Sequence, residues 1–139
     1  MKIFVSLFCG LIFLNGIELK KFTNVVIDTT NHIVWQDNDE VGDYKETSTM
    51  ADVYCQTLIL NGHTNWRVPT IKELQTIVDI QQQNTINKLF SHTTPDIYRT
   101  STKFKKDSTY KWGIDFKTGE IKYINNIDKF CIRCVREDI

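Results

Sequence analysis

The chain has 139 residues, of which 41% are hydrophobic and 24% charged, and this suits one folded domain with a real core rather than two. Lysine and arginine together number 17, as do aspartate and glutamate, so the formal net charge is zero. A neutral chain has no overall positive field of the kind that attracts nucleic acid, and we expect no nucleic-acid partner.

The first sixteen residues resemble a secretory signal peptide. Lys2 precedes an apolar run over residues 3–14, and we place the cleavage site after Gly16. The run is shorter than the roughly 20 residues of a membrane span, so we expect no stable span after cleavage and a periplasmic or secreted, cell-surface location. Two alternatives stay open. One is lipidation at Cys9, which the bulky Phe8 disfavours, and the other is an N-terminal core helix.

An early hairpin is predicted next. Residues 25–27 and 32–35 read as two short strands, and residues 28–31, Asp-Thr-Thr-Asn, have turn-forming chemistry between them. Residues 36–46 are polar and mostly acidic, and we expect them to form a surface loop.

The first predicted helix begins at Thr47 or Ser48, either of which can cap a helix. Asn61-Gly62 is predicted to end it, because both residue types are common just after helices. Its apolar stripe consists of Ala51, Tyr54, Cys55 and Leu58.

The stretch 65–74, Asn-Trp-Arg-Val-Pro-Thr-Ile-Lys-Glu-Leu, organises the rest of the chain. Pro69 keeps the residue before it extended. Thr70 is a good N-cap, and Glu73 stands where a capping box places its carboxylate. Apolar residues at helical spacing then carry a second helix to about Ile80.

The same stretch holds two candidate site residues, Trp66 and Arg67, which could line a ligand site. The structural alternative places Trp66 in the core and pairs Arg67 with carbonyls or a carboxylate, and we favour it. The expected structural motif is Trp66, Arg67, Pro69, Thr70 and Glu73.

Strand signals dominate the second half of the chain. Trp112, Ile114 and Phe116 alternate with polar residues, Thr118-Gly119 forms a tight turn, and residues 121–124 return. Residues 130–136 read as one closing strand. Helices in the first half and strands mostly in the second predict an α+β domain, with two main helices packed on short antiparallel strands.

Three cysteines remain after cleavage of the signal peptide, namely Cys55, Cys131 and Cys134. In an oxidising compartment they are candidates for disulfides, and an odd count leaves one over. Cys131 and Cys134 have redox-motif spacing, but in a regular strand they would face opposite sides. We favour a Cys55–Cys134 disulfide that ties the first helix to the final strand.

A family resemblance emerges from the order of several motifs. Val-Trp-Gln-Asp at 34–37, Tyr-Cys at 54–55 and the stretch 65–74 occur in sequence, and Trp-Gly-Ile-Asp-Phe at 112–116 and Arg-Cys-Val-Arg at 133–136 follow. Together they resemble the C-terminal domain of the Legionella collagen-like adhesin, a bacterial domain of unknown function.

The resemblance spans residues 22–137 and implies an extracytoplasmic domain of the C-type-lectin-like fold, similar also to the sulfatase-modifying-factor (formylglycine-generating-enzyme) fold. It supports the Cys55–Cys134 pairing, since those residues occupy the family's cysteine positions. Residues 98–102 depart from the pattern, because Tyr-Arg-Thr-Ser-Thr replaces Tyr-Trp-Ser-Ser-Thr. The adhesin's collagen-like repeats are absent too, so its multivalency does not carry over.

A basic segment is the main ligand-binding candidate. Its cationic residues are Arg99, Lys103, Lys105, Lys106 and Lys111. Together with the neighbouring Phe104 and Tyr110 they could engage sulfated or other anionic glycans through charge-assisted contacts. The alternative is a solvated lysine-rich loop.

The acidic segment offers weaker metal candidates, Asp37, Asp39 and Asp43, beside Glu40. Hard cations such as calcium prefer oxygen ligands of this kind. No glycine falls at the EF-hand bend and the lectin calcium motifs are missing, so a solvated loop is the alternative that we favour. We expect no metal and no cofactor.

No catalytic residues are expected, because His32, His63 and His92 are scattered and have no nucleophile partner recognisable in the sequence. The sequence therefore favours an exported, non-catalytic binding module, adhesive in character, which recognises anionic glycans or a surface protein. One alternative is an enzyme or accessory factor on a formylglycine-generating-enzyme-like scaffold. The other is a structural subunit of a surface assembly in which Cys131 bridges chains.

Overall fold

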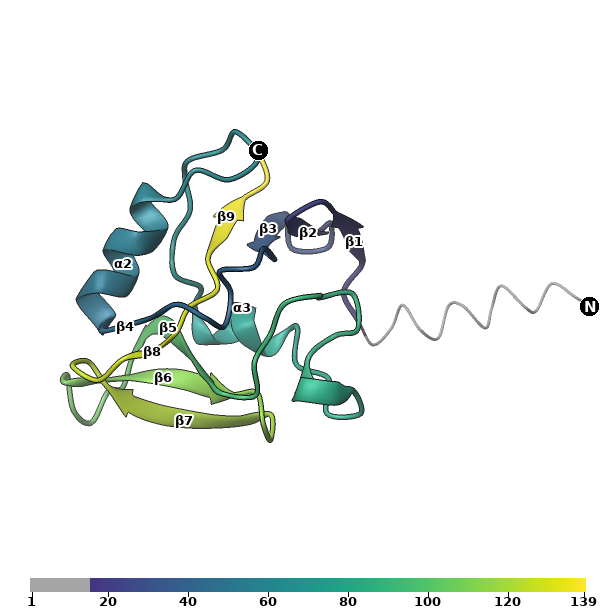
Figure 1. Ribbon diagram of the computed structural model, residues 1–139. Coiled ribbons are helices and arrows are strands. Elements are labelled where there is room, and N and C mark those ends of the chain that lie inside the picture. The colour runs from purple at the N-terminus through teal and green to yellow at the C-terminus, as the bar shows by residue number, and fades with distance from the viewer. Residues whose placement is uncertain (1–15) are drawn as a thin grey trace, which may run out of the picture.

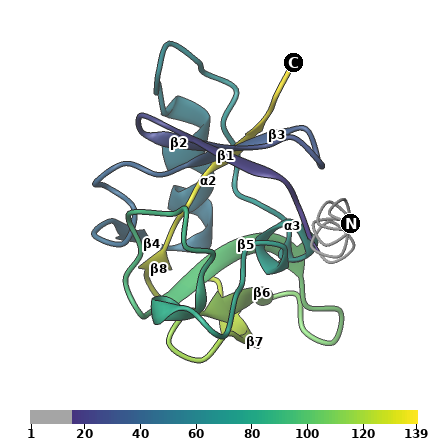
Figure 2. The same ribbon diagram turned by 90° about the vertical axis from the view of Figure 1, so that its right-hand side faces the viewer.

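The computed structural model describes residues 16–139, which form nine strands in two sheets and only short helices (Figure 1). Nearly all of the expected signal peptide, residues 1–15, lies outside the described residues. The two sheets lie one above the other in both ribbon views (Figure 2).

The four-stranded sheet has the order β1-β2-β3-β9 and its neighbours are antiparallel. Its strands are β1 (Leu19–Phe22), β2 (Val25–Asp28), β3 (Ile33–Gln36) and β9 (Val135–Glu137). The five-stranded sheet has the order β4-β8-β5-β6-β7, with one parallel pairing between β5 and β8. Its strands are β4 (Lys45–Glu46), β5 (Ile97–Lys103), β6 (Tyr110–Asp115), β7 (Glu120–Asn125) and β8 (Phe130–Cys131).

The prediction of two main helices packed on short strands, with a C-type-lectin-like α+β fold, is wrong, because the described domain is mostly β. Helix α2 (Ser48–Thr57) has ten residues, and α3 (Ile71–Gln75) has only five. A single 3₁₀ turn, η1 (Gln83–Thr85), follows.

The second helix is shorter than expected because its later residues are β-branched. Thr76, Ile77 and Val78 follow one another, and side chains of this shape lose rotamer freedom in a helix. Thr76 and Ile77 form a turn, and Val78 then forms an isolated bridge with Ile86. Ile77 is still buried. The apolar pattern therefore correctly predicted a core position, although it wrongly predicted a helical backbone there.

The expected helix starts are confirmed by their caps. The Thr47 side chain accepts a hydrogen bond from the Met50 amide, and Thr70 and Glu73 form a complete capping box. The first helix ends earlier than predicted, however. Leu58 is already extended, and the Asn61-Gly62 pair instead forms the turn that follows.

Both predicted hairpins are present. Strands β2 and β3 pair across the turn at residues 28–31, where the Asp28 carboxylate accepts the Thr30 and Asn31 amides. Strands β6 and β7 pair across Thr118-Gly119, and Gly119 adopts the positive φ of 82° that such a turn needs. Strand β1, which pairs with β2 and precedes the first predicted strand, was not predicted.

The stretch 65–74 joins the two sheets. Arg67 exchanges two backbone hydrogen bonds of 2.8 Å with Val135 of β9, and the Pro69 carbonyl accepts the Ser101 amide of β5. Trp66 is only 2% exposed, and its indole N–H donates to the His63 carbonyl. Trp66 therefore lies in the core, and the backbone around it connects the two sheets.

The expected closing strand is divided between the sheets. Strand β8 belongs to the lower sheet in Figure 1 and β9 to the upper one, so residues 132–134 cross from one to the other. Cys134 lies in this crossing and forms the predicted disulfide with Cys55 of α2. Cys131 is free and buried.

No helix within residues 16–139 is both long enough and apolar enough to cross a bilayer.

Candidate functional site

Four aromatic side chains gather at one end of the β6–β7 hairpin, and we call them the aromatic cluster: Phe104, Tyr110, Trp112 and Tyr123. The Phe104 and Tyr123 rings stack with centroids 4.6 Å apart and planes 8° apart. The Trp112 ring stands edge-on to Phe104 at 5.1 Å. Tyr110 packs on Tyr123 at 5.6 Å. Each ring supports another, so the cluster is a rigid surface.

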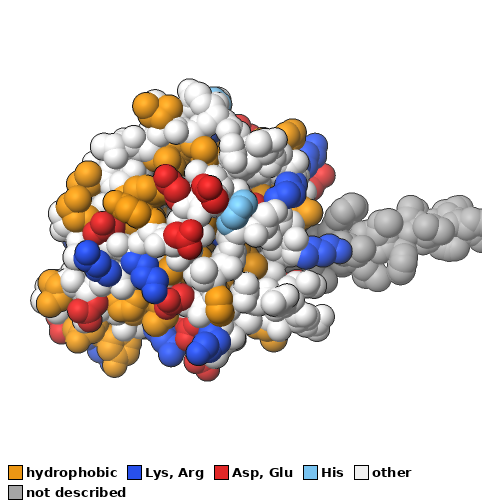
Figure 3. Space-filling view, in the orientation of Figure 1, with side chains coloured by type: hydrophobic (Ala, Val, Ile, Leu, Met, Phe, Trp, Pro, Cys, Tyr) orange, Lys and Arg blue, Asp and Glu red, His pale blue; other side chains and the backbone are white. Residues whose placement is uncertain are grey.

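Strand alternation explains why these rings reach the surface. Tyr110, Trp112 and Ile114 share one face of β6, and the register places Trp112 opposite Tyr123 of the edge strand β7. Ile114 is fully buried in the main core, whereas Tyr123 is 56% exposed. The same face of the sheet is therefore covered by the core at Ile114 and reaches solvent at Tyr123. Figure 3 shows hydrophobic side chains at the lower edge of the molecule, over this hairpin.

The predicted basic segment is only partly assembled around this cluster. Lys105 and Lys106 are exposed in the turn that links Phe104 to Tyr110. Lys103 and Lys111 lie opposite each other in the β5–β6 ladder, on the sheet face away from the rings. The Lys111 ammonium group donates to the Ser48 hydroxyl at 2.6 Å.

Arg99 does not belong to the exposed surface, since it is only 1% exposed. Its guanidinium donates to the carbonyls of Glu46 (2.8 Å) and Asn125 (3.1 Å) and to that of Asp128, and it stacks on the Phe130 ring. Burial lowers its pKa to about 10, with Asp128 acting in the opposite direction. Arg99 therefore links β4 to the loop after β7. Because its side chain is buried, it is no longer a candidate for ligand binding.

Asp37, the first of the metal candidates, is fully engaged inside the protein. Its carboxylate accepts the amides of Ser91 and His92 at 2.9 and 3.0 Å, and it pairs with Lys21 and with the buried Arg133. Burial alone would raise the pKa of Asp37, but these hydrogen bonds and the Arg133 charge hold it below its usual value. The expectation that residues 36–46 form a solvated loop is thus wrong at Asp37.

The remaining acidic residues lie elsewhere. Asp39, Glu40 and Asp43 line an open hollow together with Tyr44 and Tyr54, whose rings lie 4.6 Å apart. Figure 3 shows acidic side chains near the centre of the face of the molecule that it presents. Among residues 16–139, no group of three or more histidine, cysteine, aspartate or glutamate side chains could hold a metal ion. Asp39 and Asp43 thus share this hollow, whereas Asp37 is buried and does not line it.

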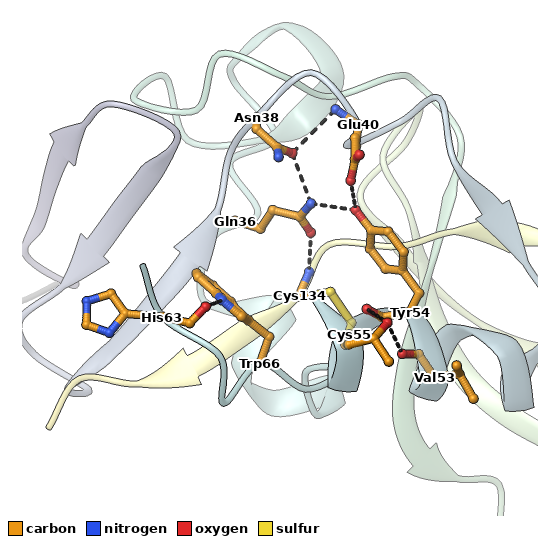
Figure 4. The surroundings of a disulfide bond; sticks show 10 residues. Gln36, Asn38, Glu40, Val53, Tyr54, Cys55, His63, Trp66 and Cys134 are labelled. Carbon is orange, nitrogen blue, oxygen red and sulfur yellow. Dashed lines mark hydrogen bonds between the residues drawn. A yellow bond between two sulfur atoms is a disulfide. The ribbon is translucent and has the colours of Figure 1, made fainter. Parts of the chain in front are cut away.

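A buried glutamine links the acidic hollow to the disulfide (Figure 4). Gln36 donates from its amide nitrogen to the Tyr54 hydroxyl and to Asn38, both at 2.9 Å. Its amide oxygen accepts the Cys134 amide, also at 2.9 Å. The Tyr54 hydroxyl in turn donates to Glu40. Burial, followed by this contact with Glu40, raises the pKa of Tyr54.

Cys131 lies in the core, where its thiol contacts the Gly42 carbonyl at 3.7 Å and the Thr94 hydroxyl at 3.8 Å. Burial raises the pKa of the thiol and so depletes the reactive thiolate. Neither a nucleophilic role nor a bridge to another chain suits a side chain in this position.

We expect Cys131 to resist iodoacetamide in the folded protein at pH 8 and to react readily once guanidinium chloride unfolds the chain. Mass spectrometry of the labelled protein measures both states. Complete labelling of native protein before any unfolding would show that the thiol is accessible and would contradict its placement in the core.

The three histidines remain apart in the fold. His32 follows the β2–β3 turn with a positive φ, and the His63 carbonyl accepts the Trp66 indole. His92 contacts Asp37 through its backbone amide.

Comparison with protein families identifies a family for this chain. The model of the Lcl C-terminal domain family matches residues 24–136, which is most of the chain. The match confirms the resemblance drawn from the motifs. A search of curated proteins finds no match.

Proposed function

This chain belongs to the Lcl C-terminal domain family, and we propose that it is an exported binding module whose aromatic–lysine face recognises sulfated or otherwise anionic glycans. We define this face as the aromatic cluster together with Lys105 and Lys106. Family membership supports the coarser statement, that the chain is a domain of a surface or adhesin-like protein.

One observation carries the proposal, namely a cluster of packed rings in which Tyr123 is 56% exposed and the other three are half-buried, with two exposed lysines in the adjoining turn. Within residues 16–139 neither Lys105 nor Lys106 forms an ion pair, although Asp107 follows directly. The Asp107 carboxylate instead accepts hydrogen bonds from Thr109 at 3.0 and 2.7 Å. The two ammonium groups are thus free to meet an anion.

The chemistry of the face fits a sulfated sugar. Ammonium groups donate charge-assisted hydrogen bonds to sulfate or carboxylate oxygens, and these are stronger than neutral ones. The ring surfaces of Tyr123 and Trp112 offer apolar area to the carbon–hydrogen face of a pyranose. Exposed charges are screened by salt, so binding should weaken as ionic strength rises.

The disulfide supports the proposed export. Disulfides persist in oxidising compartments such as the periplasm and the extracellular space, and the Cys55–Cys134 bond has the buried position of a structural one. We therefore propose a periplasmic or cell-surface location, with a glycan or a surface protein as partner.

Charge reversal tests the face. We expect Lys105→Glu/Lys106→Glu to weaken binding to heparin by roughly a hundredfold, since two charge-assisted contacts are replaced by repulsion. Calorimetric titration at low and physiological salt measures the change.

The matched control is Lys20→Glu/Lys117→Glu, which changes the net charge equally. Lys20 is on β1 and Lys117 lies in the turn at the far end of the β6–β7 hairpin, so both lie away from the aromatic cluster. Equal weakening in the two double variants would mean that net charge alone matters, and unchanged binding in the first would remove the face as the site.

A further inference from the structure

A second hollow lies beside η1, away from the aromatic–lysine face. It has a volume of about 350 Å³, in the range of small-molecule sites. Its polar lining is formed by the side-chain amides of Gln82, Gln83, Asn84 and Asn87 and the hydroxyls of Ser91 and Thr93. We call this hollow the amide cleft.

One wall of the amide cleft has strained backbone. Asn84 and Thr85 have consecutive positive φ angles of 59° and 45°. Asparagine tolerates this conformation, but for a β-branched residue such as Thr85 it is a genuine outlier. Strain of this kind persists only where surrounding contacts enforce it, and it concentrates at functional sites.

Four hydrogen bonds enforce the conformation. The Thr85 hydroxyl donates to the Phe116 carbonyl at 3.0 Å, its amide donates to Gln82, and its carbonyl accepts the Asp79 amide at 2.7 Å. The Asn84 side-chain amide donates to the Thr93 carbonyl at 3.1 Å. The wall is therefore held rigidly before any ligand arrives.

Several polar groups in the cleft have no partner within the described part of the chain. The side chains of Gln82 and Gln83 form no hydrogen bond there, and Asn87 uses only its oxygen, which accepts the Leu89 amide at 3.0 Å. Each free side-chain amide offers both donors and an acceptor. No carboxylate lines the cleft, and Lys88 is its one charged lining residue.

We infer that the amide cleft binds an uncharged, hydroxyl-rich ligand, namely a neutral sugar residue. A hydroxyl donates one hydrogen bond and accepts others, and the amides supply both counterparts. An organic cation would find no carboxylate here. The Phe90 ring, which also lines the cleft and is fixed on one face by the Arg133 guanidinium, gives the sugar an apolar contact.

This cleft is distinct from the proposed glycan face. The Thr118-Gly119 turn ends β6 near Val78 and Thr85, whereas Lys105 and Lys106 precede the start of the same strand. The two sites thus lie at opposite ends of the β6–β7 hairpin. The inference does not rest on the proposed function, and either can fail alone.

Titration by NMR with maltose, cellobiose and lactose tests the inference. We expect at least one of these disaccharides to shift the side-chain amide signals of Gln82, Gln83 and Asn87. In Gln83→Glu/Asn87→Asp the affinity should fall roughly tenfold. Both side chains lose the NH₂ group that donates hydrogen bonds, whereas the oxygen acceptor at position 87 is kept.

The matched control is Gln81→Glu, which adds a negative charge beside the cleft without lining it. It should bind like the wild type. Absence of any shift with all three disaccharides would overturn the inference, as would equal affinity in the double variant. Shifts confined to the aromatic cluster would also overturn it, while supporting the aromatic–lysine face as a sugar-binding surface.

Discussion

Loss of the Cys55–Cys134 disulfide is expected to lower the free energy of unfolding by about 4 kcal/mol. The bond joins residues 79 apart in sequence, so its removal frees a long loop in the unfolded chain. It also ties α2 to the crossing between β8 and β9, where the two sheets meet. Urea unfolding of Cys55→Ala/Cys134→Ala against the oxidised wild type measures the loss.

Cys131→Ala serves as the control, because it removes a buried sulfur that forms no covalent bond. Its cost should be limited to that of a small cavity, about 1 kcal/mol. A double variant that loses no more stability than Cys131→Ala would show that the disulfide contributes little and that the sheets hold together without it.

Removal of the Asp37 charge is expected to have an effect of similar size. Arg133 is fully buried, and Asp37 is the carboxylate that pairs with it, at 3.2 Å. Its other contacts are neutral acceptors, including the Gln36 carbonyl at 2.6 Å. Breaking one side of a buried ion pair costs about 3–5 kcal/mol because the remaining charge is uncompensated. We expect Asp37→Asn to lose this much in urea unfolding.

The exposed neighbour Asp39 provides the control, since Asp39→Asn should change stability by no more than about 0.5 kcal/mol. Acid titration adds a second measurement. The pKa of Asp37 is lowered in the folded protein, so its stabilising effect is complete above the unfolded-state value of about 3.9 and is lost as the pH falls further. Asp37→Asn should therefore lose less stability below pH 4 than the wild type does, and an unchanged pH dependence would contradict the proposed role.

Local signals in the sequence predicted local structure well. The capping box at Thr70 and Glu73 and the tight turn at Gly119 depend on residues only a few positions apart, so the sequence contained all the partners. The Cys55–Cys134 pair is distant in sequence, but few cysteines were available and the family pattern agreed.

Partners that are distant in sequence explain the failures. Asp37 and Arg99 were read as exposed because charged residues usually are. Their partners are distant in the sequence, however: Arg133 lies 96 residues from Asp37, and the Asp128 carbonyl lies 29 residues from Arg99. The prediction of the fold class was wrong because α3 ends at Gln75. The spacing of apolar residues along the chain could not show how the strands combine into two sheets.

The aromatic cluster could have been found more fully from the sequence. Trp112 and Tyr123 lie on either side of the Thr118-Gly119 turn at positions that a hairpin register can pair. The same alternation that places Ile114 in the core also places Trp112 on that face, so alternation alone does not distinguish a core position from an exposed one. Only the structure shows that the core covers Ile114 but leaves Tyr123 exposed at this end of the sheet.

The most direct test of the account is to map a sulfated heparin hexasaccharide on the isotopically labelled protein by NMR. We predict that the ring signals of Trp112 and Tyr123 and the amide signals of Lys105 and Lys106 shift together, and that added salt reverses the shifts. Shifts confined to other surfaces, or none at any salt concentration, would contradict the assignment of the aromatic–lysine face as the glycan-binding site.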